Sequence, residues 1–202
     1  MKNNNKIFLG EFIASCFLVM VIVGSGIMAE NLTNDNAVRL LANTIATGAG
    51  LFVLITAFAN ISGAHLNPFV SLSMYLTKRI KGKELLTFIP AQILGCLLGV
   101  MLANVFFEHS IIELSTKNRD GFHIFLSEIV ATFGLIFIIF ATLKDGKTTV
   151  AACVATYISA GYWFTSSTSF ANPAVAIART FTDSFTGINY LNTPTYIFAE
   201  LL

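Results

Sequence analysis

Two short segments combine an Asn-Pro pair with small and apolar residues: Asn67-Pro68-Phe69-Val70 and Asn172-Pro173-Ala174-Val175. Asparagine is favoured just before a helix and proline at its first position, so each segment predicts a helix start. A helix N-terminus carries partial positive charge, and an asparagine amide donates hydrogen bonds to hydroxyl or water oxygens. Two such starts facing each other would accept small neutral polar solutes and repel cations.

The composition is that of a membrane protein. Of 202 residues, 55% are hydrophobic and 11% are charged, and the mean hydropathy is +0.74, whereas soluble domains carry about 25% charged residues. The length fits one domain, and no basic stretch interleaved with aromatic residues indicates a nucleic-acid partner. The apolar run after Lys6 is too long for a signal-peptide core, so we expect it to remain as the first span. Three cysteines lie singly in apolar runs and predict no metal site: Cys16, Cys96 and Cys153.

The apolar runs predict five complete membrane spans, because a span needs about 20 residues. They lie at 7–29, 38–60, 84–107, 122–143 and 148–166. A sixth begins near Thr195 and stops at Leu202, and we expect an incomplete chain there rather than a second half completed by a neighbouring molecule. The stretches 67–77 and 172–182 are about half a span long. They can cross the membrane together only by entering from opposite faces and meeting in the middle.

The chain also repeats itself. Gly10-Glu11-Phe12-Ile13-Ala14 resembles Ser127-Glu128-Ile129-Val130-Ala131, and Pro90-Ala91-Gln92-Ile93-Leu94 resembles Ala199-Glu200-Leu201-Leu202. Within one domain, 1–202, this gives repeat one at about 6–107 and repeat two at about 122–202. Because each half has an odd number of spans, the halves have opposite orientations. The predicted fold is an all-α membrane protein, a six-span inverted repeat with a truncated sixth span and two re-entrant half-helices.

The cationic side chains indicate the orientation. With the N-terminus inside, most of them lie in cytoplasmic segments: Lys2, Lys6, Lys78, Arg79, Lys81, Lys83, Lys144 and Lys147. The others lie outside: Arg39, Lys117, Arg119 and Arg179. Cytoplasmic loops carry an excess of lysine and arginine, so this bias predicts a multi-pass plasma-membrane protein with a cytoplasmic N-terminus.

The segments 62–68 (Ser-Gly-Ala-His-Leu-Asn-Pro) and 172–174 (Asn-Pro-Ala) resemble the two signature loops of the major intrinsic protein family, the aquaporins and glycerol facilitators. The resemblance covers essentially the whole chain and implies homotetramers in the lipid bilayer, with one pore per subunit. It implies a central constriction formed by Asn67, Asn172, Pro68, Pro173, Ala174 and Phe69. It also implies lumen-facing carbonyls at Gly63, Ala64 and His65, and loop-bracing carboxylates at Glu11 and Glu128. Neither a cofactor nor a metal is expected.

The chain departs from the family at the expected selectivity filter. Family water channels have arginine directly after the second Asn-Pro-Ala, where this chain has Val175, and the nearest arginine is Arg179 one turn later. By alignment, Ala49 and Gly161 occupy the other filter positions beside Ala171, although a one-residue shift brings in Tyr162. A filter without the usual guanidinium is wide and apolar, which favours solutes larger than water. This pattern resembles a bacterial branch associated with arsenic resistance, which moves uncharged arsenic or antimony acids.

The expected function is therefore a passive channel for water and small uncharged polar solutes, glycerol-like or arsenite-like, that excludes ions. A strict water channel and an ion-coupled transporter are the alternatives, and Glu11 and Glu128 would form a proton relay in a pump. The re-entrant loops contain no acid for a coupling ion, and no catalytic set indicates an enzyme. Phe69 replaces the usual alanine and either fills a packing gap or narrows the lumen. Glu200 has no assigned role, because its counterpart is Gln92.

Overall fold

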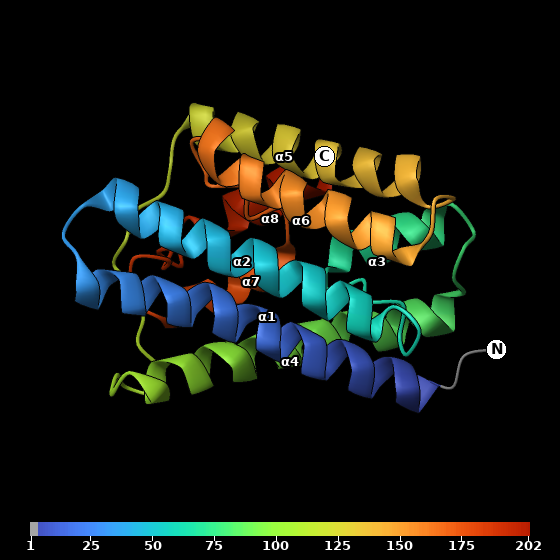
Figure 1. The fold of residues 1–202 in the computed structure, drawn as a ribbon, viewed down its shortest axis with the longest axis horizontal. Coiled ribbons are helices and arrows are strands. Elements are labelled where there is room, and N and C mark those ends of the chain that lie inside the picture. The colour runs from blue at the N-terminus through green and yellow to red at the C-terminus, as the bar shows by residue number, and fades with distance from the viewer. Residues whose placement is uncertain (1–3) are drawn as a thin grey trace.

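The computed structural model describes residues 4–202, and over these residues the chain forms helices and no β-strand. Five long helices run along the long axis of the molecule (Figure 1). They are α1 (Asn4–Leu32), α2 (Asn36–Phe58), α4 (Gly82–Phe106), α5 (Phe122–Thr142) and α6 (Lys147–Phe164). The short elements are α3 (Pro68–Leu76), α7 (Pro173–Ala178), the 3-10 turn η1 (Arg179–Phe181) and α8 (Thr193–Leu201).

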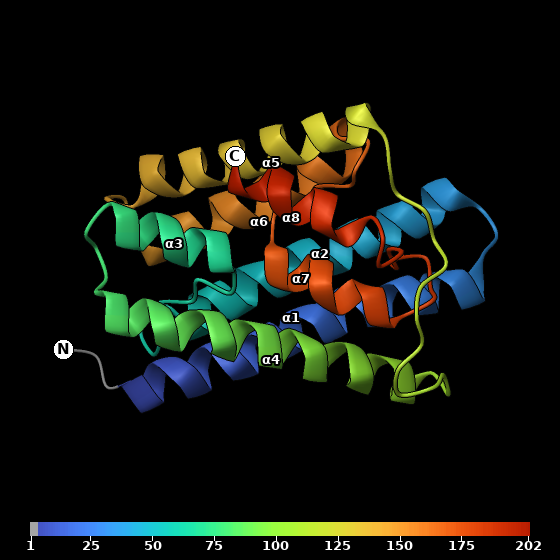
Figure 2. The same cartoon turned by 180° about the vertical axis from the view of Figure 1, so that it is seen from behind.

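The half-helices α3 and α7 lie among the long helices and extend toward opposite ends of the bundle (Figures 1 and 2). Each begins at its Asn-Pro pair. The Asn67 side chain caps α3 by accepting a 2.8 Å hydrogen bond from the Phe69 N–H. The Asn172 side chain caps α7 by accepting the N–H of Ala174 at 3.1 Å and of Val175 at 3.4 Å. The proline that follows each asparagine occupies the first helical turn, where its missing N–H leaves no hydrogen bond unmade.

Four helices, α1, α2, α4 and α5, are long and apolar enough to cross a membrane, among the residues that the structure describes. The fifth predicted span, 148–166, corresponds to a helix that is less apolar than these four. The helix there, α6, has 18 residues, but it is not one of those four. Lysine, threonine, serine and tyrosine side chains lower its hydropathy, and several of them face neighbouring helices rather than the outside.

Helices α1 and α4 pack closely against each other, and this packing positions the polar side chains between them. A side chain at Gly95 would place its Cβ 2.3 Å from the carbonyl oxygen of Phe12, and one at Gly99 would lie as close to that of Cys16. Glycine therefore allows the two helix backbones to touch. This contact brings Gln92 of α4 within hydrogen-bonding distance of Glu11 on α1.

The outward faces of the long helices are apolar. Exposed large side chains include Phe17 on α1, Val53 on α2 and Phe133 on α5. The interior, by contrast, holds many polar residues, among them both acids at matching places in α1 and α5, Glu11 and Glu128, each 0% exposed. Apolar outside and polar inside is the arrangement expected of a bundle that has lipid as its solvent.

Candidate functional site

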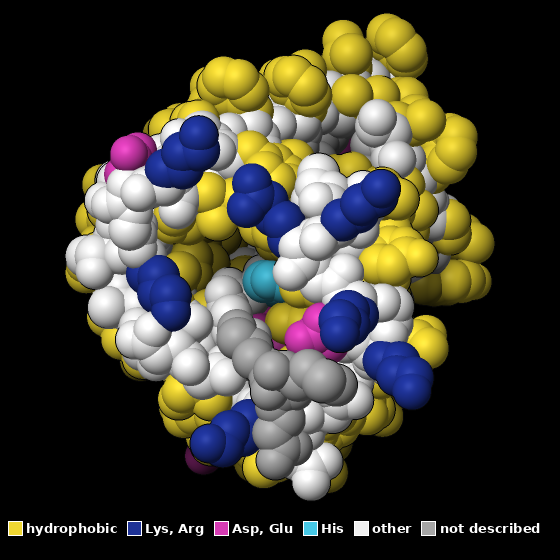
Figure 3. Space-filling view, turned by 90° about the vertical axis from the view of Figure 1, so that its right-hand side faces the viewer, with side chains coloured by type: hydrophobic (Ala, Val, Ile, Leu, Met, Phe, Trp, Pro, Cys, Tyr) yellow, Lys and Arg dark blue, Asp and Glu magenta, His cyan; other side chains and the backbone are white. Residues whose placement is uncertain are grey.

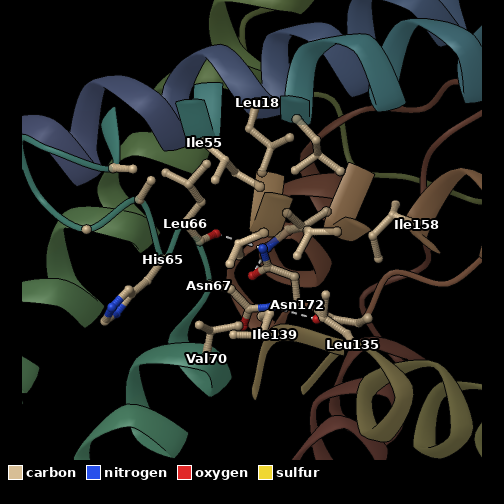
Figure 4. A pocket seen from close by; sticks show the side chains of 18 of the residues that line it. Leu18, Ile55, His65, Leu66, Asn67, Val70, Leu135, Ile139, Ile158 and Asn172 are labelled. Atoms are coloured by element: carbon tan, nitrogen blue, oxygen red, sulfur yellow. Dashed lines mark hydrogen bonds between the residues drawn. The ribbon is translucent and has the colours of Figure 1, made fainter. Parts of the chain in front are cut away.

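The centre of the site is a crossed pair of asparagines (Figure 4). The Nδ2 of Asn67 donates to the carbonyl oxygen of Ala171 at 2.6 Å, and the Nδ2 of Asn172 donates to that of Leu66 at 2.8 Å. Each half-helix start is thus tied to the loop that precedes the other one. A primary amide has two N–H groups, so each asparagine keeps a second donor for a solute in the cavity that both residues line.

The loops that precede the half-helices have the same unusual backbone. Residues Gly63, Ala64 and Leu66 have φ of 124°, 53° and 53°, and the residues at the matching places of the second loop, 168, 169 and 171, have φ of 65°, 50° and 46°. Left-handed backbone at non-glycine residues is strained, by roughly 1–3 kcal/mol each, and persists only where surrounding contacts hold it. The carbonyls of Leu66 and Ala171, which accept the two asparagine amides, belong to these left-handed residues.

Two buried carboxylates supply the contacts that hold these loops. Glu11 accepts the N–H of His65 at 3.1 Å and of Leu66 at 2.7 Å, and also the Ser62 hydroxyl. Glu128 accepts the N–H of residue 170 at 2.9 Å and of residue 171 at 2.8 Å. Each acid therefore satisfies consecutive backbone donors that no helix or strand would satisfy.

A cavity of about 390 Å³ passes the paired asparagines. At one end, the α3 mouth, it is lined by Arg79, Ile80, Leu143 and Lys147. At the other, the α7 mouth, it is lined by Thr47, Tyr162, Val175 and Arg179. Because α3 and α7 extend to opposite ends of the bundle, the cavity runs lengthwise through the molecule. Its long wall is apolar, formed by residues such as Leu18, Ile55, Leu135, Ile139 and Ile158 (Figure 4).

The α7 mouth carries a fixed positive charge. Arg179 is 3% exposed and lines the cavity. Its Nε donates to the carbonyl of Thr186, and its guanidinium carbon lies 3.5 Å from the centroid of the Phe170 ring. In the same lining, the Tyr162 hydroxyl donates to the Thr47 hydroxyl at 3.1 Å. This end of the cavity therefore combines one guanidinium, two hydroxyl groups and an apolar side chain at Val175.

The segment 107–121 packs across the α7 end of the molecule. The Ser115 N–H donates to Thr180 at 2.9 Å, and the Lys117 carbonyl accepts the N–H of Asn189 at 2.8 Å. Burial, with the nearby Arg119 and Arg179, lowers the pKa of the Lys117 ammonium to about 8. This end consequently loses a positive charge as the pH rises through about 8.

The opposite, α3 mouth is also cationic. Figure 3 shows lysine and arginine side chains around a hollow in this end of the molecule, with a histidine inside it. Arg79 lies over the Phe140 ring at 5.6 Å, and the Lys147 Nζ donates to Asn60. Cationic side chains therefore line the cavity at both of its mouths.

The sequence and the fold are similar to those of known proteins. The sequence matches the Major intrinsic protein family over residues 1–201. It is 46% identical over 194 residues to Aquaglyceroporin AqpS of Rhizobium meliloti (strain 1021), covering 96% of this chain and 83% of that protein.

This chain belongs to the major intrinsic protein family.

Other members of the family are more distant. Aquaporin TIP1-2 of Musa acuminata is 36% identical over 149 residues, which cover 70% of this chain and 58% of that protein. The X-ray structure of the aquaglyceroporin from Plasmodium falciparum matches with a TM-score of 0.76, covering 99% of this chain and 90% of that one. At 19% identity this likeness shows the fold alone: the chain has the all-helical, aquaporin-like fold.

The structure corrects two filter positions inferred by alignment with the family. Ala49 is exposed and lies in a shallow groove between α2 and α6, away from the central cavity. The reason is that Gly48 packs on α6, where a Cβ would lie 2.2 Å from the Ser159 hydroxyl, and this turns Thr47 inward. Gly161 is likewise pressed against the second loop, where its Cβ would lie 2.7 Å from that of Ser169. The cavity is lined at these two levels by Thr47 and Tyr162.

The structure places the remaining expected pore residues of this family member in two groups. Those lining the cavity are Gly63, Ala64, His65, Asn67, Ala171, Asn172, Val175 and Arg179. Those behind it, outside the lining within residues 4–202, are Pro68, Phe69, Pro173 and Ala174. The ring of His65 points away from the labelled lining residues in Figure 4; it stacks on Phe88 at 4.2 Å and meets the Ser71 hydroxyl at 3.0 Å.

Two polar residues that support the loops had no role in the sequence analysis. Gln92 donates to Glu11 at 2.8 Å, and Glu200 accepts the N–H of Asn172 at 3.0 Å. The repeat pairs Gln92 with Glu200, and this correspondence was the signal that could have placed both behind the loops. Over residues 4–202, the structure assembles no group of three His, Cys, Asp or Glu side chains that could hold a metal ion.

Phe69 provides a direct test of the cavity lining. The side chain is half-buried and lies outside the lining, so Phe69→Ala should leave water and glycerol permeability within about twofold of wild type. The loss of packing should cost about 1–3 kcal/mol, less than the 3–5 kcal/mol typical of a fully buried phenylalanine. Stopped-flow permeability and a thermal melt of the same preparation measure the two effects. A larger change in permeability at unchanged stability would indicate that Phe69 narrows the lumen.

Proposed function

We propose that this protein is a passive membrane channel for water and small uncharged polar solutes of glycerol size, a class that includes arsenite-like acids. The observation that carries the proposal is the lengthwise cavity past Asn67 and Asn172, with loop carbonyls and amides on one side and aliphatic side chains on the other. Membership in the major intrinsic protein family and the aquaglyceroporin relative support the same reading. A channel of this kind forms and breaks no covalent bond, so we do not assign an enzymatic activity.

The two-sided wall fits a polyol. Glycerol carries hydroxyl groups along one edge and C–H groups along the other, so its hydroxyls can meet the amides of Asn67 and Asn172 while its carbons contact aliphatic side chains. The hydroxyls replace the water that these polar groups lose, and unsatisfied polar groups would otherwise be costly. Uncharged hydroxylated acids of similar size present the same donors and acceptors.

The mouth at Val175 favours glycerol passage over strict water selection. A valine in place of arginine leaves the lumen beside the second asparagine free of a guanidinium. Arg179, one turn further along, keeps a positive charge at the same end but is held against Phe170 and the carbonyl of Thr186. We infer that this displaced arginine opposes cations without closing the filter to larger neutral solutes.

Ion exclusion follows from the charges along the path. The loops 62–66 and 166–171 contain no acidic residue, and the carboxylates of Glu11 and Glu128 are occupied by loop N–H groups. A permeating cation would meet two helix N-termini without a counter-charge. This arrangement disfavours an ion-coupled transporter, which needs a coordinating site for its coupling ion.

We further infer the assembly and topology. The order of elements 4–106 matches that of 122–201, which supports an inverted repeat with halves at about 6–107 and 122–202. The excess of lysine and arginine at the α3 end supports a cytoplasmic N-terminus, and we propose the plasma membrane as the location. The family resemblance supports a homotetramer with a pore in each subunit.

Proteoliposomes distinguish a passive channel from a coupled transporter. Glycerol uptake, measured by stopped-flow light scattering, should be unchanged when sodium or proton gradients are imposed or dissipated, and vesicles should show no protein-dependent cation conductance. Protein-free vesicles provide the control. Uptake that stops when a gradient is dissipated would contradict a passive pore.

A further inference from the structure

Two buried acids stand together behind the second re-entrant loop. Glu128 of α5 and Glu200 of α8 are each 0% exposed, and their side chains lie within hydrogen-bonding range of each other. Glu128 accepts the N–H groups of Phe170 and Ala171, and Oε1 of Glu200 accepts the next N–H, that of Asn172, at 3.0 Å. Two carboxyl groups therefore share three consecutive backbone donors.

Behind the first re-entrant loop, the corresponding pair consists of one carboxyl group and one amide. Glu11 accepts the N–H groups of His65 and Leu66, and the Nε2 of Gln92 donates to its Oε2 at 2.8 Å. Gln92 and Glu200 correspond in the repeat, and both are 0% exposed. An amide donates a hydrogen bond while neutral, whereas a carboxyl group donates only when it is protonated.

The surroundings of the second pair do not compensate two negative charges. Oε2 of Glu200 is buried and accepts a hydrogen bond from no N–H or hydroxyl group in the part of the chain that the structure describes. The cations that face the pair are directed elsewhere: Arg179 donates to the carbonyl of residue 186 and Arg119 to those of residues 185 and 187. Other polar neighbours are hydroxyl groups, those of Ser167, Tyr157 and Tyr196. Two adjacent carboxylates in a buried site strongly disfavour double ionisation.

We propose that Glu128 and Glu200 bind one proton between them at neutral pH, with the O–H of Glu200 donating to Glu128 as the N–H of Gln92 donates to Glu11. The site takes a proton as its only ligand. It holds the second loop and, through the N–H of Asn172, the start of α7. This inference does not depend on which solute the channel carries.

Infrared spectroscopy tests the proposal directly, because only a protonated carboxyl group shows the carboxylic C=O stretch. At about pH 7 the wild type should show the absorption of one such group per chain. Glu200→Gln should abolish it while the protein folds and conducts, since glutamine supplies the donor without a proton. Gln92→Glu should add a second absorption of similar intensity, because it builds the same pair behind the first loop. Glu108→Gln, at an exposed acid, is the matched control and should change nothing.

Four results would overturn the proposal. The first is a wild-type spectrum without protonated carboxyl at about pH 7. The second is an absorption that Glu200→Gln leaves intact. The third is a Glu200→Gln protein that fails to fold, because an amide in that position should support the second loop as Gln92 supports the first. A folded Gln92→Glu protein that shows no added absorption would count equally against it.

Discussion

Replacing Glu11 by alanine should abolish a stably folded protein. The carboxylate accepts hydrogen bonds from the N–H groups of His65 and Leu66, the Ser62 hydroxyl and the Gln92 amide. Each buried donor left without a partner costs about 1–3 kcal/mol, so the total for the four donors is roughly 4–12 kcal/mol. This rivals the whole stability of a typical domain, about 5–15 kcal/mol. Size-exclusion chromatography and thermal melts of the purified protein measure the loss.

The control lies on the same helix. Glu30, near the far end of α1, is half-buried and accepts one backbone N–H, that of Phe185, at 2.7 Å. Glu30→Ala should therefore cost only about 1 kcal/mol. Glu11→Gln should lie between the two, since it keeps the shape and one acceptor oxygen. If Glu11→Ala melts within a few degrees of Glu30→Ala, the carboxylate does not hold the loop.

Introducing an arginine at the α7 mouth should convert the channel toward water selectivity. Val175 is 3% exposed and lines the cavity one turn before Arg179. Val175→Arg would add a guanidinium to this lumen, so we expect glycerol uptake to fall at least ~tenfold, about 1.4 kcal/mol in barrier height. Water permeability should fall by less than ~threefold, because a water molecule still passes a narrow polar opening. Stopped-flow measurements with both solutes on the same vesicles give the ratio.

The matched variant is Val175→Met, which adds length without charge or donors. It should reduce glycerol uptake by only a few fold, since a methionine side chain is flexible and bends along the wall. Equal glycerol uptake in wild type and Val175→Arg would show that residue 175 does not form the filter. An equal loss in both variants would assign the effect to size rather than to the guanidinium.

The helix starts were predictable from the sequence because their determinants are local. Asn67 and Asn172 cap α3 and α7 through their own side chains, and proline at the first helical position needs no tertiary partner. The same holds for the long apolar runs. Their lengths predicted helices close to the observed bounds, because the thickness of the bilayer fixes how many apolar residues a span needs.

Which side chains of each helix point into the cavity was not predictable in the same way. A helix turns about 100° per residue, so the two-residue error between Ala49 and Thr47 moves a side chain roughly to the opposite face. The choice is made by tertiary contacts, Gly48 against Ser159 on α6, that no local pattern reveals. Glu200 was missed for a related reason: its partner is the N–H of Asn172, and only the folded loop brings that donor to α8.

Water and glycerol uptake by the same wild-type proteoliposomes tests the central claim most directly. Stopped-flow light scattering records shrinkage in an impermeant osmolyte and re-swelling in a glycerol gradient. We predict that protein-containing vesicles re-swell with glycerol much faster than protein-free vesicles, and that they show a parallel increase in water permeability. Fast water movement with no glycerol re-swelling above the protein-free control would contradict the account, because a cavity with Val175 at its mouth should admit both solutes.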